Sequence, residues 1–103
     1  MKRGEVRWYR FNAPDKRRPV VVLTRDSILG QLGEATVAPV TSTIRDIPTE
    51  VVLDETDGMP RRCAVNLDHE QTDAKTRLSG MITTLAPARM AEIRKALLFA
   101  LGW

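Results

Sequence analysis

The chain of 103 residues is long enough for one compact domain spanning residues 1–103 and too short for two. Its hydrophobic share of 43% and charged share of 28% are ordinary for folded globular proteins, so neither a disordered chain nor a membrane protein is indicated. One cysteine excludes an internal disulfide, and no secretory signal is recognisable, so we expect the reducing cytoplasm. The net charge of +3 includes two basic blocks, residues 16–18 and 61–62, which indicate a polyanionic partner or a solvated basic surface.

Short runs of β-branched, aromatic and apolar residues predict closely spaced strands, separated by turn-forming residues. They cover residues 6–11, 19–23, 35–41, 48–53, 63–67 and 78–83. Pro19 fits the start of its strand, where no ladder hydrogen bond is lost, and Pro39 indicates an edge or a bulge. The segments between the strands predict a loop (12–15), a loop with one helical turn (25–34), a turn (54–60) and a polar stretch with a short helix (68–77).

The C-terminal segment has helical periodicity. Charged residues occupy one side of this segment. The apolar residues that recur at helical spacing on the other side are Met90, Ile93, Leu97 and Leu101. Pro87 suits the first helical position, and Gly102 suits the position after the end. Five or six short strands followed by one helix predict a mainly β fold of the α+β class, with the helix packed against a small barrel.

A search for catalytic chemistry gives mostly exclusions. His69 is the only histidine, so one chain cannot hold a two-histidine acid–base pair, and a single cysteine beside it does not make a transition-metal site. The acidic residues 54–58 do not fit a calcium loop, because its first and twelfth positions would be Leu53 and Ala64. No phosphate-binding glycine loop is present. The sequence therefore predicts no metal and no cofactor.

One arginine and three hydroxyl residues remain, at predicted strand ends. Arg18 opens the second strand and is held extended because it precedes Pro19. The third strand ends with Thr41, Ser42 and Thr43, and in a small barrel two such strand ends can be adjacent. A guanidinium beside hydroxyls can bind a phosphate through two parallel N–H donors and further O–H donors. Taken alone, these residues are explained better as ordinary surface side chains.

The order of motifs along the chain adds to this picture. The segments are residues 3–6 (Arg-Gly-Glu-Val), 18–23 (Arg-Pro-Val-Val-Val-Leu), 38–42 (Ala-Pro-Val-Thr-Ser), 65–72 and 75–78, before the closing amphipathic helix. This succession covers nearly the whole chain and resembles the MazF/PemK family of toxin endoribonucleases. The resemblance implies an SH3-like barrel with a C-terminal helix, the fold type of MazF, PemK and CcdB toxins. It also implies sequence-specific cleavage of single-stranded RNA, a homodimer, and neutralisation by a cognate antitoxin.

By this resemblance, Arg18 and Thr41 match the pair of residues held to be catalytic in the family. The residues that would contact RNA are Lys16, Arg17, Ser42 and Thr43. In the implied reaction the RNA 2′-hydroxyl attacks the adjacent phosphate without a metal, and the ends formed are a 2′,3′-cyclic phosphate and a 5′-hydroxyl. Because guanidinium is effectively never deprotonated in proteins, the general base is unassigned, with Glu5 and His69 as auxiliary candidates.

Two other functions are open on the same barrel. The first is a non-catalytic module that binds RNA or an antitoxin. The second is a gyrase-poisoning toxin of the CcdB type, because Trp103 is similar to the tryptophan-bearing C-terminal end on which that class depends. The combination of Arg18-Pro19 with Thr41 argues against the second, since a gyrase poison needs no pair of residues that cleaves a phosphodiester.

Overall fold

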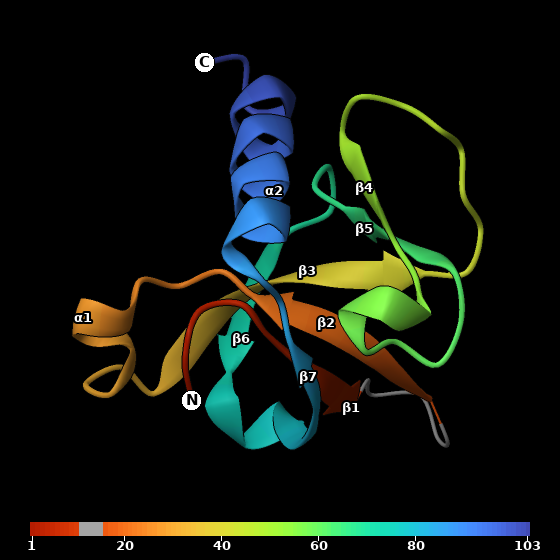
Figure 1. The fold of residues 1–103 in the computed structure, drawn as a ribbon. Coiled ribbons are helices and arrows are strands. Elements are labelled where there is room, and N and C mark those ends of the chain that lie inside the picture. The colour runs from red at the N-terminus through yellow and green to blue at the C-terminus, as the bar shows by residue number, and fades with distance from the viewer. Residues whose placement is uncertain (11–15) are drawn as a thin grey trace.

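The computed structural model describes residues 1–10 and 16–103, so Phe11 and the predicted loop at residues 12–15 lie outside the described residues. Figure 1 shows a mainly β structure with one long C-terminal helix. The strands are β1 (Glu5–Arg10), β2 (Arg17–Val22), β3 (Glu34–Thr41), β4 (Glu50–Leu53), β5 (Cys63–Asn66), β6 (Gln71–Ala74) and β7 (Leu78–Thr84). The α-helices are α1 (Asp26–Leu29) and α2 (Pro87–Ala100), and the 3-10 helices are η1 (Glu55–Asp57) and η2 (Lys75–Arg77). Within the two described ranges, no helix is long and apolar enough to cross a membrane.

The described strands form one antiparallel sheet in the order β4–β5–β3–β2–β1–β7, and β6 also pairs with β3. In the described part of the chain the two end strands, β4 and β7, are not hydrogen-bonded to each other, so the barrel is an open one. A side chain bridges these ends instead, because the Thr83 hydroxyl of β7 donates to the Asp57 carbonyl oxygen of η1 at 2.9 Å. The predicted mainly β class with a C-terminal helix is confirmed.

One strand differs from the sequence prediction in kind. At residues 68–77 the sequence predicts a polar stretch with a short helix, whereas the structure has β6 followed by the short helix η2. Pairing with β3 holds β6 in place, and the Thr36 and Thr72 hydroxyl oxygens lie 2.6 Å apart across this pair. Because β6 is polar and none of its residues is buried, it lacks the apolar alternation that identifies a strand in a sequence.

Each of the two strand prolines lies where one side of its strand has no ladder partner. β2 begins at Arg17, so Pro19 is inside the strand and not at its start as expected; it pairs with β1, and pairing with β3 begins one residue later. β3 is an interior strand, so Pro39 does not mark an edge. On one side of β3, the partner is β6 up to Val37 and β5 from Val40 onward. Pro39 therefore lies in a gap between two neighbours, where that side of β3 has no ladder to lose.

The short elements between the strands agree with the sequence. The predicted helical turn is α1, and the predicted turn at residues 54–60 contains η1. α2 begins with Pro87 as expected, and Gly102 beyond its end has φ +77°, a left-handed conformation that suits glycine.

Two clusters of buried side chains lie on opposite faces of the central strands. In the larger cluster, Val6, Val21 and Ala38 face one another across β1, β2 and β3, and Ile93 and Ala96 of α2 pack against the same core. The smaller cluster on the other face consists of Tyr9, Val20, Val22, Leu29, Ala35 and Val37. Because side chains alternate along a strand, the interior positions of β2 supply both clusters while its first residues are left for the surface.

Candidate active site

Arg18 and Thr41 lie at adjoining ends of two neighbouring strands, β2 and β3. Val20 of β2 pairs with Pro39 of β3, and continuing this antiparallel register by two residues places Arg18 opposite Thr41. Residues opposite each other share a face of the sheet. Both side chains line one pocket of about 540 Å³, here called the strand-end pocket. The structure thus brings together the two strand ends that the sequence singles out.

The strand-end pocket is cationic and rich in hydroxyl groups. Its charged and hydroxyl-bearing lining residues are Arg17, Arg18, Arg61, Thr41, Ser42 and Thr43. Among the described residues that line it there is no carboxylate and no imidazole, so the pocket is suited to an anionic ligand. In residues 1–10 and 16–103, Arg18 makes no ion pair, and its guanidinium donors are available to a ligand.

The Thr41 hydroxyl is oriented by the backbone that follows it. Its Oγ1 accepts a hydrogen bond from the N–H of Thr43 at 3.1 Å. Because one lone pair is engaged in this way, the hydroxyl hydrogen is left to donate to a ligand. Thr41 is half-buried, whereas Ser42 and Thr43 are exposed at the pocket mouth.

The two residues before Arg18 occupy different places. The Arg17 guanidinium carbon lies 4.9 Å from the centre of the Trp8 ring, a cation–π geometry, and both side chains line the strand-end pocket. Trp8 is half-buried opposite Pro19, which fixes the indole beside the start of β2. Lys16 lines a second pocket instead.

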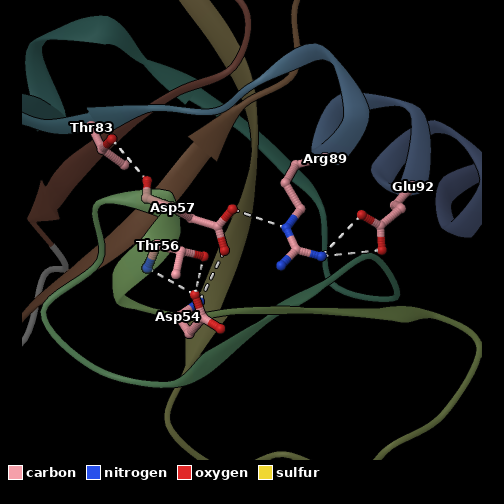
Figure 2. A network of polar contacts seen from close by, with 6 residues as sticks. All are labelled: Asp54, Thr56, Asp57, Thr83, Arg89 and Glu92. Atoms are coloured by element: carbon pink, nitrogen blue, oxygen red, sulfur yellow. Dashed lines mark hydrogen bonds and ion pairs between the residues drawn. The ribbon is translucent and has the colours of Figure 1, made fainter.

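The far wall of the strand-end pocket is the segment after η1, which carries Arg61. Figure 2 shows that Arg89 of α2 points toward Asp57 of η1: its Nε donates to Asp57 Oδ1 at 2.9 Å. Its Nη1 forms an ion pair with Glu92 Oε2 at 3.0 Å. The hydrogen bonds to Asp57 and Glu92 raise the pKa of Arg89 above its ordinary value. The helix is therefore tied to the loop that completes the pocket.

The η1 turn is also fixed by its own backbone. The Asp54 carboxylate accepts from the Thr56 N–H at 2.8 Å, and the Asp57 carboxylate accepts from the Asp54 N–H at 3.0 Å, a capping box (Figure 2). The Thr56 hydrogen bonds lower the pKa of the Asp54 carboxyl below its ordinary value. Gly58 then ends the turn with φ +88°, and a Cβ there would lie 2.3 Å from Thr83 Oγ1. Glycine is required at this point by both the backbone and the space.

A second pocket of about 380 Å³, here called the His69 pocket, adjoins Arg18. Its apolar floor is formed by Val20, Val37 and Pro39. Its polar rim is formed by Lys16, Arg18, His69 and Gln71. Arg18 lines both pockets and lies between them. The auxiliary candidate His69 therefore lies beside the arginine that the sequence singles out, although it is exposed.

His69 is held by a neighbouring amide. The Nδ2 of Asn66 lies 3.0 Å from Nδ1 of His69, and Oδ1 of Asn66 accepts the N–H of Asp68 at 2.9 Å. Asn66 is buried, so its amide is packed as well as hydrogen-bonded. The ring nitrogen of His69 that is left for a ligand is Nε2.

Glu5, the other auxiliary candidate, lines neither pocket. It precedes Tyr9, the partner of Arg18 in β1, by four residues, which is about 13 Å along a strand. Its carboxylate accepts a hydrogen bond from Arg7 Nε at 2.8 Å. Burial raises the pKa of Glu5, but the Arg7 hydrogen bond and charge, with smaller contributions from the Lys2 backbone and the N-terminus, leave the pKa below its ordinary value. The structure does not bring Glu5 to Arg18.

Some residues of the two pockets are not singled out as site residues by the sequence. Arg61 belongs to a basic block that the sequence shows, but nothing in the sequence places it in the same pocket as Thr41. Gln71 belongs to a segment that carries the family resemblance, but the sequence gives it no site role, and its strand β6 is not predicted. As for metals, no group of three or more histidine, cysteine, aspartate or glutamate side chains that could hold an ion is found in the part of the chain that the structure describes.

Comparison with known proteins decides the family. The model of the PemK-like, MazF-like toxins of type II toxin–antitoxin systems matches residues 2–101. The chain belongs to this toxin family. The resemblance to MazF/PemK toxins expected from the sequence is thereby confirmed, and the match spans all the strands and α2.

Two relatives from Mycobacterium tuberculosis illustrate the likeness to other MazF toxins. The chain is 47% identical over 96 residues to probable endoribonuclease MazF5, with 92% of this chain and 87% of that protein covered. It is 36% identical over 103 residues to probable endoribonuclease MazF2, with 99% of both covered.

Solved structures of MazF toxins have the same fold. The M. tuberculosis toxin MazF-mt6 superposes with a TM-score of 0.87 at 31% identity, covering 95% of this chain and 96% of that one. A mycobacterial endoribonuclease in complex with its cognate antitoxin gives a TM-score of 0.89 at 26% identity, covering 99% and 95%.

Proposed function

We propose that this MazF-family toxin is a sequence-specific endoribonuclease that cuts single-stranded RNA without a metal ion. The observation that carries the proposal is the position of Arg18, which makes no ion pair in the described residues, lies opposite Thr41 and borders both pockets. Its relatives are named as endoribonucleases, which supports the same reaction. Cleavage of RNA in the cell stops translation and growth.

The residues of the strand-end pocket suit an attack by the RNA on itself. The 2′-oxygen forms a bond to the adjacent phosphorus, the bond from phosphorus to the 5′-oxygen breaks, and a 2′,3′-cyclic phosphate and a 5′-hydroxyl end result. One proton leaves the 2′-oxygen and one is gained by the 5′-oxygen. Arg18 stabilises the charge on the phosphoryl oxygens through two parallel N–H donors, and Thr41 donates its hydroxyl hydrogen to the same group.

The remaining cationic and hydroxyl side chains bind the RNA on either side of the cut. Arg17 and Arg61 flank the strand-end pocket, and Lys16 is on the rim of the His69 pocket. Ser42 and Thr43 offer hydroxyl groups at the mouth. Because single-stranded RNA presents one charge per nucleotide, this arrangement holds several phosphates at once.

The toxin acts in the cytoplasm as a homodimer and is neutralised by a cognate antitoxin. A mycobacterial endoribonuclease and a MazF of Deinococcus radiodurans have both been solved with antitoxin, which supports this partner. Light scattering of the purified toxin alone measures the mass of the homodimer. Light scattering of the toxin mixed with the antitoxin isolated with it from the same cells measures the mass of the complex. A monomer at micromolar concentration would contradict the homodimer.

The decisive experiment is to incubate the purified protein with long single-stranded RNA in excess EDTA. We expect fragments with cyclic-phosphate ends from the wild type. Arg18→Ala should cut at least about 100-fold more slowly, as expected for loss of a preorganised charge stabiliser. Arg94→Ala is the matched control, because it removes the same charge from an exposed position on α2 and should cut at the wild-type rate.

The outcomes separate the other functions. RNA that is bound but left intact by the wild type would indicate a binding module. RNA that is neither bound nor cut, together with inhibition of gyrase, would indicate a CcdB-type toxin. Trp103, which is 88% exposed after the end of α2, is the residue to truncate in that case.

A further inference from the structure

We propose that the His69 pocket binds one nucleobase of the RNA beside the cleaved phosphate, and that His69 recognises this base as a fixed hydrogen-bond donor. The inference rests on the proposed ribonuclease function and names a subsite for its substrate. Three observations support it: the position of the pocket beside Arg18, the chemistry of the residues that line it, and the position of the proton on the His69 ring.

The pocket lies next to the proposed site of cleavage. Arg18 lines both the strand-end pocket and the His69 pocket, so a phosphate held by Arg18 has its attached nucleoside within reach of either. The pocket lies on the face of the sheet that carries Val20 and, two residues earlier, Arg18. A chain that passes over Arg18 can therefore direct one base onto this face.

The shape and chemistry of the pocket suit a base better than a phosphate. Its floor is made by Val20, Val37 and Pro39, which offer an apolar surface to the flat face of a ring. Its volume of about 380 Å³ is in the range of small-ligand sites. Gln71 pairs with Val37 across β6 and β3, so its side-chain amide, which also forms a hydrogen bond with Tyr9, stands at the rim of this floor.

The protonation of the imidazole follows from its neighbours. The backbone N–H of Asp68 can only donate, so the Asn66 atom that it contacts at 2.9 Å must be the carbonyl oxygen Oδ1. The other Asn66 atom is then Nδ2, which can only donate and lies 3.0 Å from His69 Nδ1. Nδ1 must accept this hydrogen bond, so neutral His69 carries its proton on Nε2.

This chain of donors gives His69 a role different from that of a general base. Nδ1 is already occupied by Asn66, and Nε2 carries the proton, so the ring offers a donor and no free lone pair to the pocket. A donor at a fixed position selects bases that present a carbonyl oxygen or a ring nitrogen there, and it rejects bases that present an amino group. His69 is thus a specificity-determining residue.

The tautomer can be measured directly because His69 is the only histidine of the chain. In the ¹⁵N spectrum of the full-length protein at alkaline pH, we expect a protonated Nε2 and an unprotonated Nδ1. The isosteric change Asn66→Asp replaces the donor by an acceptor and should move the proton to Nδ1. A wild-type ring protonated at Nδ1 would overturn the inference whether or not the protein cuts RNA.

Binding is tested with the same spectra. A mixed-sequence single-stranded DNA lacks the 2′-hydroxyl and cannot be cut by this chemistry, so it reports binding alone. At saturation we expect the Nε2 signal of His69 to shift. An unchanged His69 signal with a protein that does bind the DNA would show that the pocket takes no base.

Specificity is tested by sequencing the cuts made in a random RNA library. Wild type should prefer one base at a position next to the cut, His69→Leu should lower that preference at least about fivefold, and His69→Gln, which keeps an N–H donor, should retain part of it. Equal preferences in all three proteins would refute the base contact. A uniform loss of rate for every sequence would also refute it, because it would place the donor on a phosphate. A wild type that cuts nothing would instead refute the proposed function.

Discussion

Gly58 connects the fold to the site more tightly than its size suggests, and replacing it with alanine should destabilise the protein. Its backbone has φ +88°, and an added Cβ would lie 2.3 Å from Oγ1 and 2.8 Å from Cβ of Thr83. The left-handed backbone costs alanine about 1–2 kcal/mol. Displacing Thr83 also breaks its hydrogen bond to the Asp57 carbonyl, worth about 1 kcal/mol. The expected loss in the free energy of unfolding is the sum of these two contributions, about 2–3 kcal/mol.

Urea unfolding followed by tryptophan fluorescence measures this loss. A domain of this size unfolds with a slope of about 1–3 kcal/mol per molar urea, so a loss of about 2 kcal/mol should lower the midpoint by at least about 0.7 M. Gly30→Ala is the matched control, because Gly30 has φ −70° and nothing within 4 Å of an added Cβ. It should be neutral or stabilise by up to about 1 kcal/mol. All proteins are compared at one concentration, since formation of the proposed homodimer would add to stability.

The reasoning would be refuted by a Gly58→Ala midpoint within about 0.3 M of wild type at an unchanged slope. The variant should also lose RNA cleavage more than stability alone explains, because the segment that follows Gly58 carries Arg61 to the strand-end pocket. Activity is therefore measured well below the unfolding transition.

Three further results are expected. Arg18→Lys keeps the charge but loses the two-pronged donor, so RNA cleavage should fall at least about tenfold, and a near-normal rate would exclude the paired contact. Tyr9→Phe should flatten both ends of the pH–stability profile. The hydrogen bond from Tyr9 lowers the pKa of the Asp73 carboxyl below 3.8, so the wild type loses stability as the pH falls below about 3.8. Burial and, to a smaller extent, the Asp73 carboxylate raise the pKa of Tyr9 above 10.0, so the wild type also loses stability as the pH rises above 10.0. Urea midpoints of both proteins measured across the pH range check this prediction. A variant that loses as much stability as the wild type at low and at high pH would contradict it. Arg61→Ala should make the log–log salt dependence of RNA binding shallower by about 0.7, and the Arg94→Ala control should leave it unchanged.

The strands that could be predicted are those with a strong local signal. β2, β3 and β5 contain buried runs of valine and alanine, which mark them whatever their partners are. β6 could not be predicted, because Gln71–Ala74 is polar and becomes a strand only by pairing with β3. The same pairing explains Pro39, whose position depends on where β6 ends and β5 begins beside β3.

The closeness of Arg18 and Thr41 could be predicted because both lie at the ends of apolar strands, but not the contacts that depend on register between distant segments. The catalytic roles of Arg18 and Thr41 were implied only by the family resemblance and stay a prediction. Arg61 reaches their pocket only through the turn at η1, and that turn depends on an ion pair between Asp57 and Arg89. The state of His69 depends on the orientation of one buried amide, which no sequence pattern reveals.

The pairing of β1 with β7 has a consequence for the timing of activity during synthesis. β1 can pair with β7 only after β7 has been synthesised. α2, whose residues pack into the larger core, is synthesised after β7. Folds that join such distant segments form slowly, in roughly milliseconds to seconds. A nascent chain therefore carries Arg18 and Thr41 long before it can hold them in place.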